Sequence, residues 1–134
     1  MKLSHASSCA VHGVVGLATH PSGRLVPSHR VAHAEAVPEQ FLLRVLTLLV
    51  RAGIVLATSG ARGGFCLARP ADRITLLAVV EAVDGPIRGT AGYPEEWGDR
   101  GVHQLVDALC QRIADQTRRR LGRVSIADLA RKAK

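Results

Sequence analysis

The segment Gly60–Gly64 has the sequence GARGG and places Arg62 between glycines. Glycine-rich loops can hold phosphate groups because their backbone N–H groups approach the ligand closely. A nucleotide-binding loop, however, has the spacing G-x-G-x-x-G or G-x-x-x-x-G-K-[ST] and leads into a helix. This segment has neither spacing, and the strand-like run Phe65–Ala68 follows it. We therefore predict the tip of a β-hairpin, and we expect neither an enzyme nor a nucleotide-binding domain.

Polar side chains around position 40 have the chemistry needed to read base edges in DNA. Gln40 can pair with adenine and Arg44 with guanine through two hydrogen bonds each, and Glu39 can accept a hydrogen bond from cytosine. The same residue types also cover the solvated face of ordinary surface helices. From these residues alone, both interpretations stay open.

The composition is that of a basic, globular chain. Its 134 residues are enough for one domain, and a hydrophobic fraction of 47% is enough for a packed core. The formal net charge of +7 and the isoelectric point of about 10.4 indicate an acidic partner. Nucleic acid, an anionic membrane surface and an acidic protein all fit this description.

We expect the protein to act in the cytoplasm and not in a membrane. No apolar run reaches the roughly 18 residues that span a bilayer. His12 interrupts the apolar stretch that a cleaved secretion signal would need. The cysteines Cys9, Cys66 and Cys110 are odd in number and far apart, which argues against a disulfide framework and for a reducing compartment.

Three helices are predicted to position the polar groups of the first half. Ser4 is a suitable N-cap for the first helix, and the segment His20–Pro27 breaks it. Ser28 can cap a short second helix, Pro38 suits the first turn of a third, and Gly53 ends that third helix. Two helices joined by a tight turn outline a helix-turn-helix. The apolar stripe of the first helix consists of Val11, Val14, Val15 and Ala18.

A hairpin and three more helices are predicted for the rest of the chain. The runs Ile54–Ser59 and Phe65–Ala68 indicate paired strands, which gives the element order of a winged helix. Thr75 can cap a fourth helix, a long helix covers about 102–120, and Ser125 starts a last helix with a capping-box pattern. We therefore predict a mostly α fold with a small β-hairpin wing. The apolar stripe of the long helix consists of Val102, Leu105, Val106, Leu109 and Ile113.

The order of these elements, together with several local motifs, resembles the Rrf2 family of bacterial winged-helix transcription regulators. The motifs are MKLS at the start, VPEQFLLRVLTLLVRAGIV, SGARGGFCLARPADRITLLAVVEAVDGP and SIADLA. The resemblance covers nearly the whole chain. It implies a winged helix-turn-helix DNA-binding domain in residues 1–86, a loop in 87–101, and a dimerisation helix with a short C-terminal helix in 102–134. It also implies a homodimer that binds double-stranded DNA at a near-palindromic operator and acts as a repressor.

The resemblance places DNA contacts at three sites. The start of the third helix would enter the major groove, and the hairpin tip would reach a minor groove or a phosphate. The N-terminus of the first helix would bind phosphates, unless it is frayed. The side chains concerned are Lys2, Ser4, His5, Ser28, Glu39, Gln40, Arg44, Thr47, Ser59 and Arg62. A solvated or acid-paired surface is favoured over a nucleic-acid contact for the cluster Arg118, Arg119, Arg120 and Arg123. A basic tail is formed by Arg131, Lys132 and Lys134.

Many members of this family hold an iron–sulfur cluster, and its usual ligands include three cysteines in the loop before the long helix. Here Ile87–Gly101 contains no cysteine, so we expect no conventional cluster and no cofactor. Cys9, His33 and Cys110 leave open a metal site or a thiol-based redox switch. Each of these three residues also fits an ordinary structural role.

Two further alternatives concern the signal and the loss of DNA binding. Tyr93 and Trp97 could line a site for a small molecule, or they could anchor the loop on the core. The apolar Leu43 and Leu48 lie on the expected outer side of the third helix. They would fit a dimeric interaction protein, or a small-molecule or redox sensor of the same fold, with weak or lost operator binding.

Overall fold

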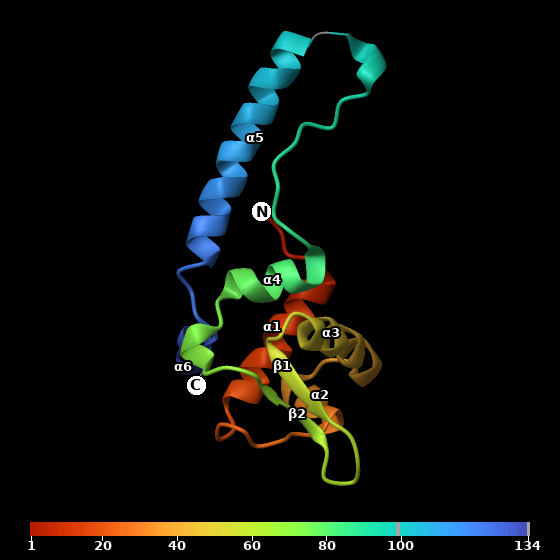
Figure 1. Ribbon diagram of the computed structural model, residues 1–134, viewed down its shortest axis with the longest axis vertical. Helices are drawn as coiled ribbons and strands as arrows, with labels where there is room; N and C mark the ends of the chain where they lie inside the picture. The colour runs from red at the N-terminus through yellow and green to blue at the C-terminus, as the bar shows by residue number, and fades with distance from the viewer. Residues whose placement is uncertain (99, 134) are drawn as a thin grey trace.

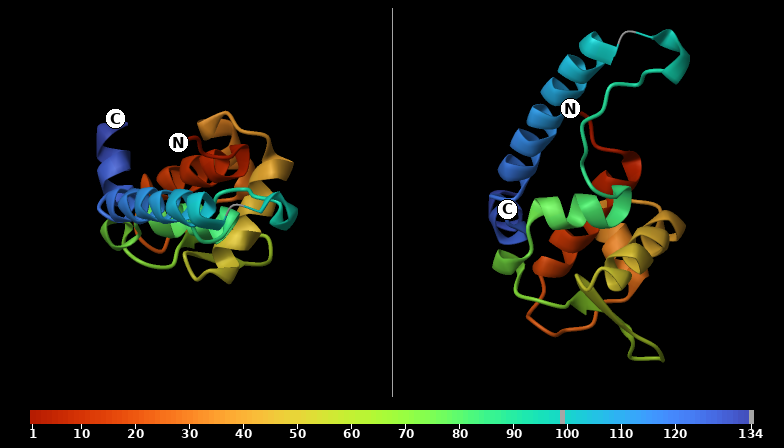
Figure 2. Two further views of the ribbon diagram at one scale, coloured as in Figure 1. Left: turned by 90° about the horizontal axis from the view of Figure 1, so that it is seen from above. Right: turned by 45° about the horizontal axis from the view of Figure 1, so that its top comes forward.

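The computed structural model describes residues 1–98 and 100–133 and shows a helical body with two extensions (Figure 1). A two-stranded hairpin projects from one end of the body, and a long helix rises past the opposite end (Figure 1, Figure 2). The helices are α1 (His5–Ala18), α2 (Ser28–Glu35), α3 (Glu39–Arg51), α4 (Leu76–Asp84), α5 (Arg100–Leu121) and α6 (Ile126–Lys132). The strands are β1 (Val55–Thr58) and β2 (Gly64–Leu67), and the 3-10 turns η1 and η2 cover Ala71–Arg73 and Glu95–Trp97.

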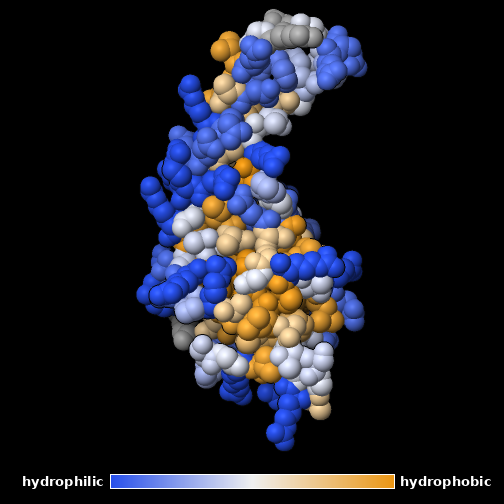
Figure 3. Space-filling view, in the orientation of Figure 1, coloured by the Kyte–Doolittle hydropathy of each residue, from blue (hydrophilic) through white to orange (hydrophobic). Residues whose placement is uncertain are grey.

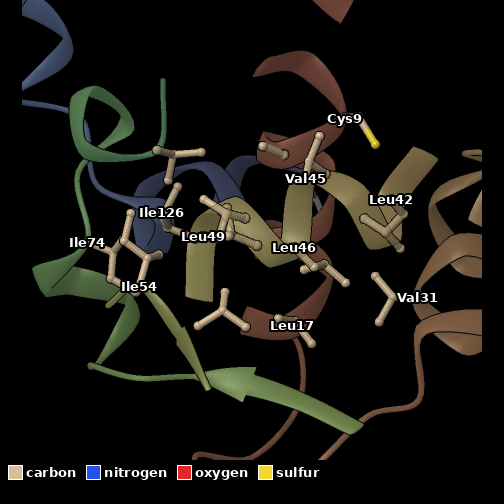
Figure 4. Packing of buried hydrophobic residues seen from close by; sticks show 14 of the residues in the cluster. Cys9, Leu17, Val31, Leu42, Val45, Leu46, Leu49, Ile54, Ile74 and Ile126 are labelled. Atoms are coloured by element: carbon tan, nitrogen blue, oxygen red, sulfur yellow. The ribbon is translucent and has the colours of Figure 1, made fainter. Parts of the chain in front are cut away.

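The hydrophobic core is aliphatic and surrounds α1. This helix contacts α2, α3, α4 and α6. Figure 4 shows the buried residues of α3 meeting side chains from α1, from α2 and from the segments near β1 and α6. Full burial of one such side chain contributes about 1.5–3 kcal/mol. The helical spacing of these residues therefore decides which face of α3 turns outward. The buried residues of α3 are Leu42, Val45, Leu46 and Leu49.

The hairpin is held to the rest of the body through the loop between α1 and α2. Strands β1 and β2 pair antiparallel, with Val55 opposite Leu67 and Thr58 opposite Gly64. Val26, in the α1–α2 loop, exchanges two backbone hydrogen bonds with Phe65 of β2, each 2.9 Å long. This bridge places a third extended segment beside β2 and holds the hairpin to the α1–α2 loop.

The predicted fold class, a mostly helical chain with a small hairpin, is confirmed. Ser4, Thr75 and Ser125 all accept a backbone hydrogen bond at 3.0 Å as helix N-caps. Ser125 and Asp128 form the complete capping box. The long helix starts at residue 100 and extends one residue past the predicted end.

Two predictions of local structure were wrong in detail. Ser28 does not cap α2, because Pro27 takes the N-cap position in an extended conformation and Ser28 is the first helical residue. The strands are also displaced: β1 is shorter than the run Ile54–Ser59 at both ends, and β2 begins one residue before Phe65. The ends of a strand depend on which residues of the other strand pair with it. The apolar alternation within one segment does not contain this information.

Helix α5 leaves much of its apolar stripe uncovered. Among the α5 residues whose burial the structure describes, only Ala114 is buried. Arg118 pairs with Glu81 of α4, with 3.5 Å between Nη2 and Oε1. The exposed apolar residues are Val102, Leu105, Val106, Leu109 and Ile113. Within the described residues, no helix is both long and apolar enough to cross a bilayer.

Candidate nucleic-acid interface

The outer face of α3 carries three exposed polar side chains in one row. Gln40, Arg44 and Thr47 follow the spacing i, i+4, i+7, opposite the buried leucines of the same helix. The guanidinium carbon of Arg44 lies 5.9 Å from the centre of the Phe41 ring, a distance compatible with a cation–π contact. The hydroxyl of Thr47 donates to the carbonyl of Leu43 at 2.9 Å, so its own oxygen remains available as an acceptor.

The starts of α2 and α3 are tied to each other. The hydroxyl of Ser28 donates to Oε1 of Glu39 at 3.0 Å. Both helices begin after a proline, Pro27 and Pro38, and neither has a side-chain cap. Their first N–H groups are therefore open to an external acceptor such as a phosphate. The second carboxylate oxygen of Glu39, Oε2, can accept a hydrogen bond from an amino group of a DNA base.

The hairpin tip presents Ser59 and Arg62 to solvent. The turn is closed by a 3.0 Å hydrogen bond from the N–H of Gly63 to the carbonyl of Gly60. A Cβ atom at Gly63 would lie 2.1 Å from the carbonyl oxygen of Thr58, so this turn requires glycine. The end of the hairpin is hydrophilic in Figure 3, and it lies on the same side of the body as α3 in Figure 1.

The two arginines of this surface are not neutralised by acidic side chains. In the part of the chain that the structure describes, neither Arg44 nor Arg62 forms an ion pair. Both side chains are exposed. An unpaired guanidinium can bind a phosphate or a guanine without first losing an internal partner.

The amino terminus is placed apart from the hairpin tip. The end marked N lies toward α5, and the tip lies at the opposite end of the body (Figure 1, Figure 2). Lys2 and His5 are exposed there. Ser4 caps α1 and also donates to Asp84 of α4 at 2.7 Å, so its hydroxyl has a structural role.

The structure thus brings part of the predicted set together. Gln40, Arg44 and Thr47 share one face, and Ser28 and Glu39 are bonded at its edge. Ser59 and Arg62 stand on a separate projection on the same side, whereas Lys2, Ser4 and His5 lie elsewhere. DNA contact by each of these residues stays a prediction.

Asp84 is a structural residue that sequence reasoning missed. Its carboxylate accepts from Ser4 and from Ser7, and both of these bonds are 2.7 Å long. The partners are 80 and 77 positions away in the chain. No local pattern could have indicated these contacts.

The loop before α5 starts with a bond to α4, from the N–H of Ile87 to Glu81 at 2.8 Å, and its later part contacts α5. The N–H of Ala91 donates to Asp107, whose other oxygen lies 3.2 Å from Nε2 of His103. The ring of Tyr93 packs at 4.5 Å from that of His103 and at 5.6 Å from that of Trp97. Trp97 itself is 66% exposed. The alternative that these aromatic residues anchor the loop on the core is therefore wrong.

The candidate ligands for a metal are spread over the chain. Cys9 is buried, Cys110 is partly exposed and His33 is exposed. Burial raises the pKa of the Cys9 thiol, which makes it a poor thiolate. In residues 1–98 and 100–133, no three His, Cys, Asp or Glu side chains come together as a metal site.

The basic clusters near the C-terminus are partly paired with acids. Arg118 pairs with Glu81, which confirms the acid-paired interpretation for this residue. Arg131 of the predicted tail pairs with Asp128. Lys134 lies outside the described residues.

Comparison with known sequences identifies transcription regulators. The family model "Rrf2: Iron-dependent Transcriptional regulator" matches residues 3–132. A Mycobacterium tuberculosis H37Rv protein, Rv1287, whose name describes it as an HTH-type transcriptional regulator, is 38% identical over 87 residues. That match covers 65% of this chain and 54% of the relative, so the chain matches only about half of that protein's length. The HTH-type transcriptional regulator IscR of Xenorhabdus nematophila is 26% identical over 98% of this chain and 80% of its own.

Solved structures share the fold at low sequence identity. CymR of B. subtilis, described as a global cysteine regulator, superposes with a TM-score of 0.77 at 23% identity, covering 98% of each chain. IscR of T. potens gives a TM-score of 0.77 at 20% identity, covering 100% of this chain and 89% of the other. At these identities the likeness concerns the arrangement of helices and hairpin.

Proposed function

The chain belongs to the Rrf2 family of transcriptional regulators, and we propose that it binds a near-palindromic DNA operator as a homodimer and represses transcription. The observation that carries this proposal is the exposed row Gln40, Arg44 and Thr47 on α3, with the unpaired Arg62 on a projecting hairpin of the same side. Members of the family regulate transcription and are not enzymes, which agrees with the lack of a nucleotide-binding spacing in Gly60–Gly64.

The chemistry of the α3 row suits the major groove. Gln40 and Arg44 can each form two hydrogen bonds with a base edge, to adenine and to guanine respectively. The open N–H groups at the start of α2 and α3 can bind phosphates next to that groove. Arg62, between glycines that allow close approach, suits the minor groove or the backbone.

The exposed stripe of α5 supports the homodimer. Leu105 is 73% exposed and Leu109 is 55% exposed, although both belong to a regular apolar stripe. Such a stripe on a projecting helix is costly in water, and burying each of its large side chains would gain about 1.5–3 kcal/mol. A second copy of α5, related by a twofold axis, would cover the stripe with an identical surface. The same symmetry would place two DNA-binding domains opposite the two half-sites of the operator.

We further propose that this regulator works in the cytoplasm without a conventional iron–sulfur cluster. The family model is described as iron-dependent, but the loop Ile87–Gly101 lacks the cysteines that would hold such a cluster. An absorption spectrum of protein purified without oxygen tests this point. Bands in the visible region that are lost on chelation would contradict it.

DNA binding is tested by finding the operator through genomic footprinting and then measuring its affinity against a scrambled duplex. Arg44→Ala and Arg62→Ala should each weaken operator binding by about 1–3 kcal/mol. Arg51→Ala, at the other end of the exposed α3 surface, removes the same charge and should have a much smaller effect. Equal affinity for operator and scrambled DNA at moderate salt would refute sequence-specific binding.

A dimeric interaction protein that has lost operator binding is the second candidate. An open apolar face around Leu43 and Leu48 of α3 would support this candidate. Both are only partly exposed, so they do not form an open apolar face. If Arg44→Ala and Arg62→Ala both left DNA binding unchanged, this second candidate would be favoured.

A further inference from the structure

A cavity of about 260 Å³ lies between the α1–α2 loop and the segment that follows β2. Its lining includes two buried residues, Leu17 at the end of α1 and Cys66 of β2. Its polar side chains are His20, Ser22, Arg24 and Arg69. A water molecule takes up roughly 30 Å³ of liquid, so the space suits a small solute rather than a single water.

The cavity is positively charged. Arg24 comes from the α1–α2 loop and Arg69 from the segment after β2, and none of the described residues that line the cavity is acidic. Neither arginine forms an ion pair within residues 1–98 and 100–133. Two guanidinium groups that share one concave space, without an internal carboxylate, form a receptor for an oxyanion.

The end of α1 opposes the binding of an anion at this cavity. A helix C-terminus carries partial negative charge, which disfavours an anion. Here the carbonyl of Gly16 already accepts from both the N–H and the hydroxyl of Thr19, and the carbonyl of Leu17 accepts from the N–H of His20. With these carbonyls occupied, the two full charges of Arg24 and Arg69 dominate.

We propose that this cavity binds a small oxyanion, a carboxylate or phosphate group of a free metabolite, between Arg24 and Arg69. His20 and Ser22 supply further hydrogen-bond donors at its rim. Leu17 and Cys66 also line the cavity and are buried, whereas a contact with the DNA backbone would need only exposed side chains.

An anion bound at this site would affect the hairpin through short backbone connections. Arg24 precedes Val26 by two residues, and Val26 is bonded twice to Phe65, the neighbour of Cys66 on β2. An anion that bridges Arg24 and Arg69 therefore clamps the α1–α2 loop to the base of the hairpin. This coupling rests on the proposed function, because the hairpin is the part that would contact DNA. Binding of the anion itself does not rest on it.

The binding test uses inorganic phosphate and, separately, succinate, titrated into DNA-free protein at constant ionic strength set with sodium chloride. Amide NMR signals of the cavity segments should shift and saturate with at least one probe. Arg24→Ala/Arg69→Ala should weaken that binding by about tenfold or more, because each lost guanidinium removes charge-assisted hydrogen bonds. Arg73→Ala, a neighbouring exposed arginine outside the cavity, should leave it unchanged. Shifts that do not saturate with either probe, or that persist in the double variant, would overturn the proposal.

Cys66 offers an independent readout that does not depend on arginine substitution. A bound anion should slow its alkylation by a small neutral reagent, as measured by mass spectrometry of the tryptic peptides. Cys9, beside a different cavity lined by His5 and Phe41, serves as the internal control. Equal protection of both thiols, or of neither, would count against a site at Arg24 and Arg69.

The phosphate could also belong to DNA, and a further measurement separates the two sources. If the double variant loses operator affinity and salt dependence while free anions never bind, the arginines contact the DNA backbone and the proposal is wrong. If free anions bind the parent protein and change its operator affinity, but not that of the double variant, the coupling is supported. Anion binding without any DNA binding would leave this site standing and would refute the proposed function instead.

Discussion

At the scale of single residues, one carboxylate joins two helices of the body. Ser4 and Ser7 of the α1 start both donate to Asp84 at the end of α4. Ser7 has no exposed surface, so its hydroxyl depends on this acceptor. A buried hydroxyl without a partner costs about 1–3 kcal/mol.

Asp84→Ala should therefore lower the free energy of unfolding by about 1–3 kcal/mol, as measured by urea denaturation. Asp72→Ala, an exposed carboxylate in η1 with no hydrogen bond in the described part of the chain, is the matched control and should change little. Similar losses in the two variants would contradict the role of Asp84.

The capping box of α6 makes a prediction about pH. The backbone N–H of Ser125, then its hydroxyl and then the charge of Arg131, lower the pKa of Asp128 below its usual range. A carboxyl whose pKa is lower in the folded state stabilises the fold above its unfolded pKa, and this contribution is lost as the pH falls through the folded value. Asp128→Ala should thus melt below the parent protein at neutral pH, and the difference should close as the solution becomes acidic. A difference that stays constant with pH would refute this assignment.

Single-residue features were predictable when the partner lay within one helical turn. Ser4, Thr75 and Ser125 were recognised as caps because a cap bonds to an N–H only three positions away. Ser28 was assigned wrongly because Pro27 is also suited to the position before a helix. Asp84 could not be found at all, since its partners are distant in sequence.

At the scale of elements, the hairpin depends on a close backbone contact near its turn, where Gly64 pairs with Thr58. A Cβ atom at Gly64 would lie 2.6 Å from the carbonyl oxygen of Val26, and Gly64 has a φ of +153°. Both facts favour glycine at the point where β2 meets the α1–α2 loop.

Gly64→Ala should cost about 1–3 kcal/mol of stability through strain, and it should weaken operator binding by disturbing the hairpin. Gly92→Ala is the control, because a Cβ atom at Gly92 meets nothing within 4 Å. Thermal unfolding and DNA affinity measure the two effects. A Gly64→Ala protein that matches the parent protein in both would show that the contact can relax without cost.

The helices were predictable as elements, but the fastening of the loop before α5 was not. Apolar residues at helical spacing indicated α1, α3 and α5, because periodicity reports one buried face. The composition of residues 87–101 indicated a loop. The hydrogen bond from the N–H of Ala91 to Asp107 and the packing of His103 on Tyr93 join positions 16 and 10 residues apart, beyond the reach of a local pattern.

At the scale of the whole molecule, the exposed apolar stripe of α5 should affect the proposed dimer without affecting the stability of each subunit. Its residues contribute little to the core of the body, which is built around α1 and α3. Changes in the stripe should therefore alter the oligomeric state without unfolding the protein. The resemblance predicted this dimer helix, whereas only the structure showed how much of the stripe is left uncovered.

Leu105→Glu should convert the proposed dimer to a folded monomer, because a charge in the centre of an apolar interface is costly. The two half-sites would then be bound independently, and operator affinity should fall by about a hundredfold or more. Gln104→Glu adds the same charge outside the stripe and should leave the dimer intact. Light scattering and operator titration give the two readouts, and a Leu105→Glu dimer of normal mass would refute this interface.

Because α5 projects from the body, a small change in its angle produces a large displacement at its free end. Helix α5 contacts the body around Ala114 and the Arg118–Glu81 pair, so the part of the helix that projects from this joint back to residue 100 is about 24 Å long. A rotation of about 8° at that joint would displace the far end of α5 by about 3.4 Å, the rise of one base pair. In the proposed dimer, the angle between α5 and the body would thus set the spacing along DNA of the two DNA-binding domains, although this joint contacts no base.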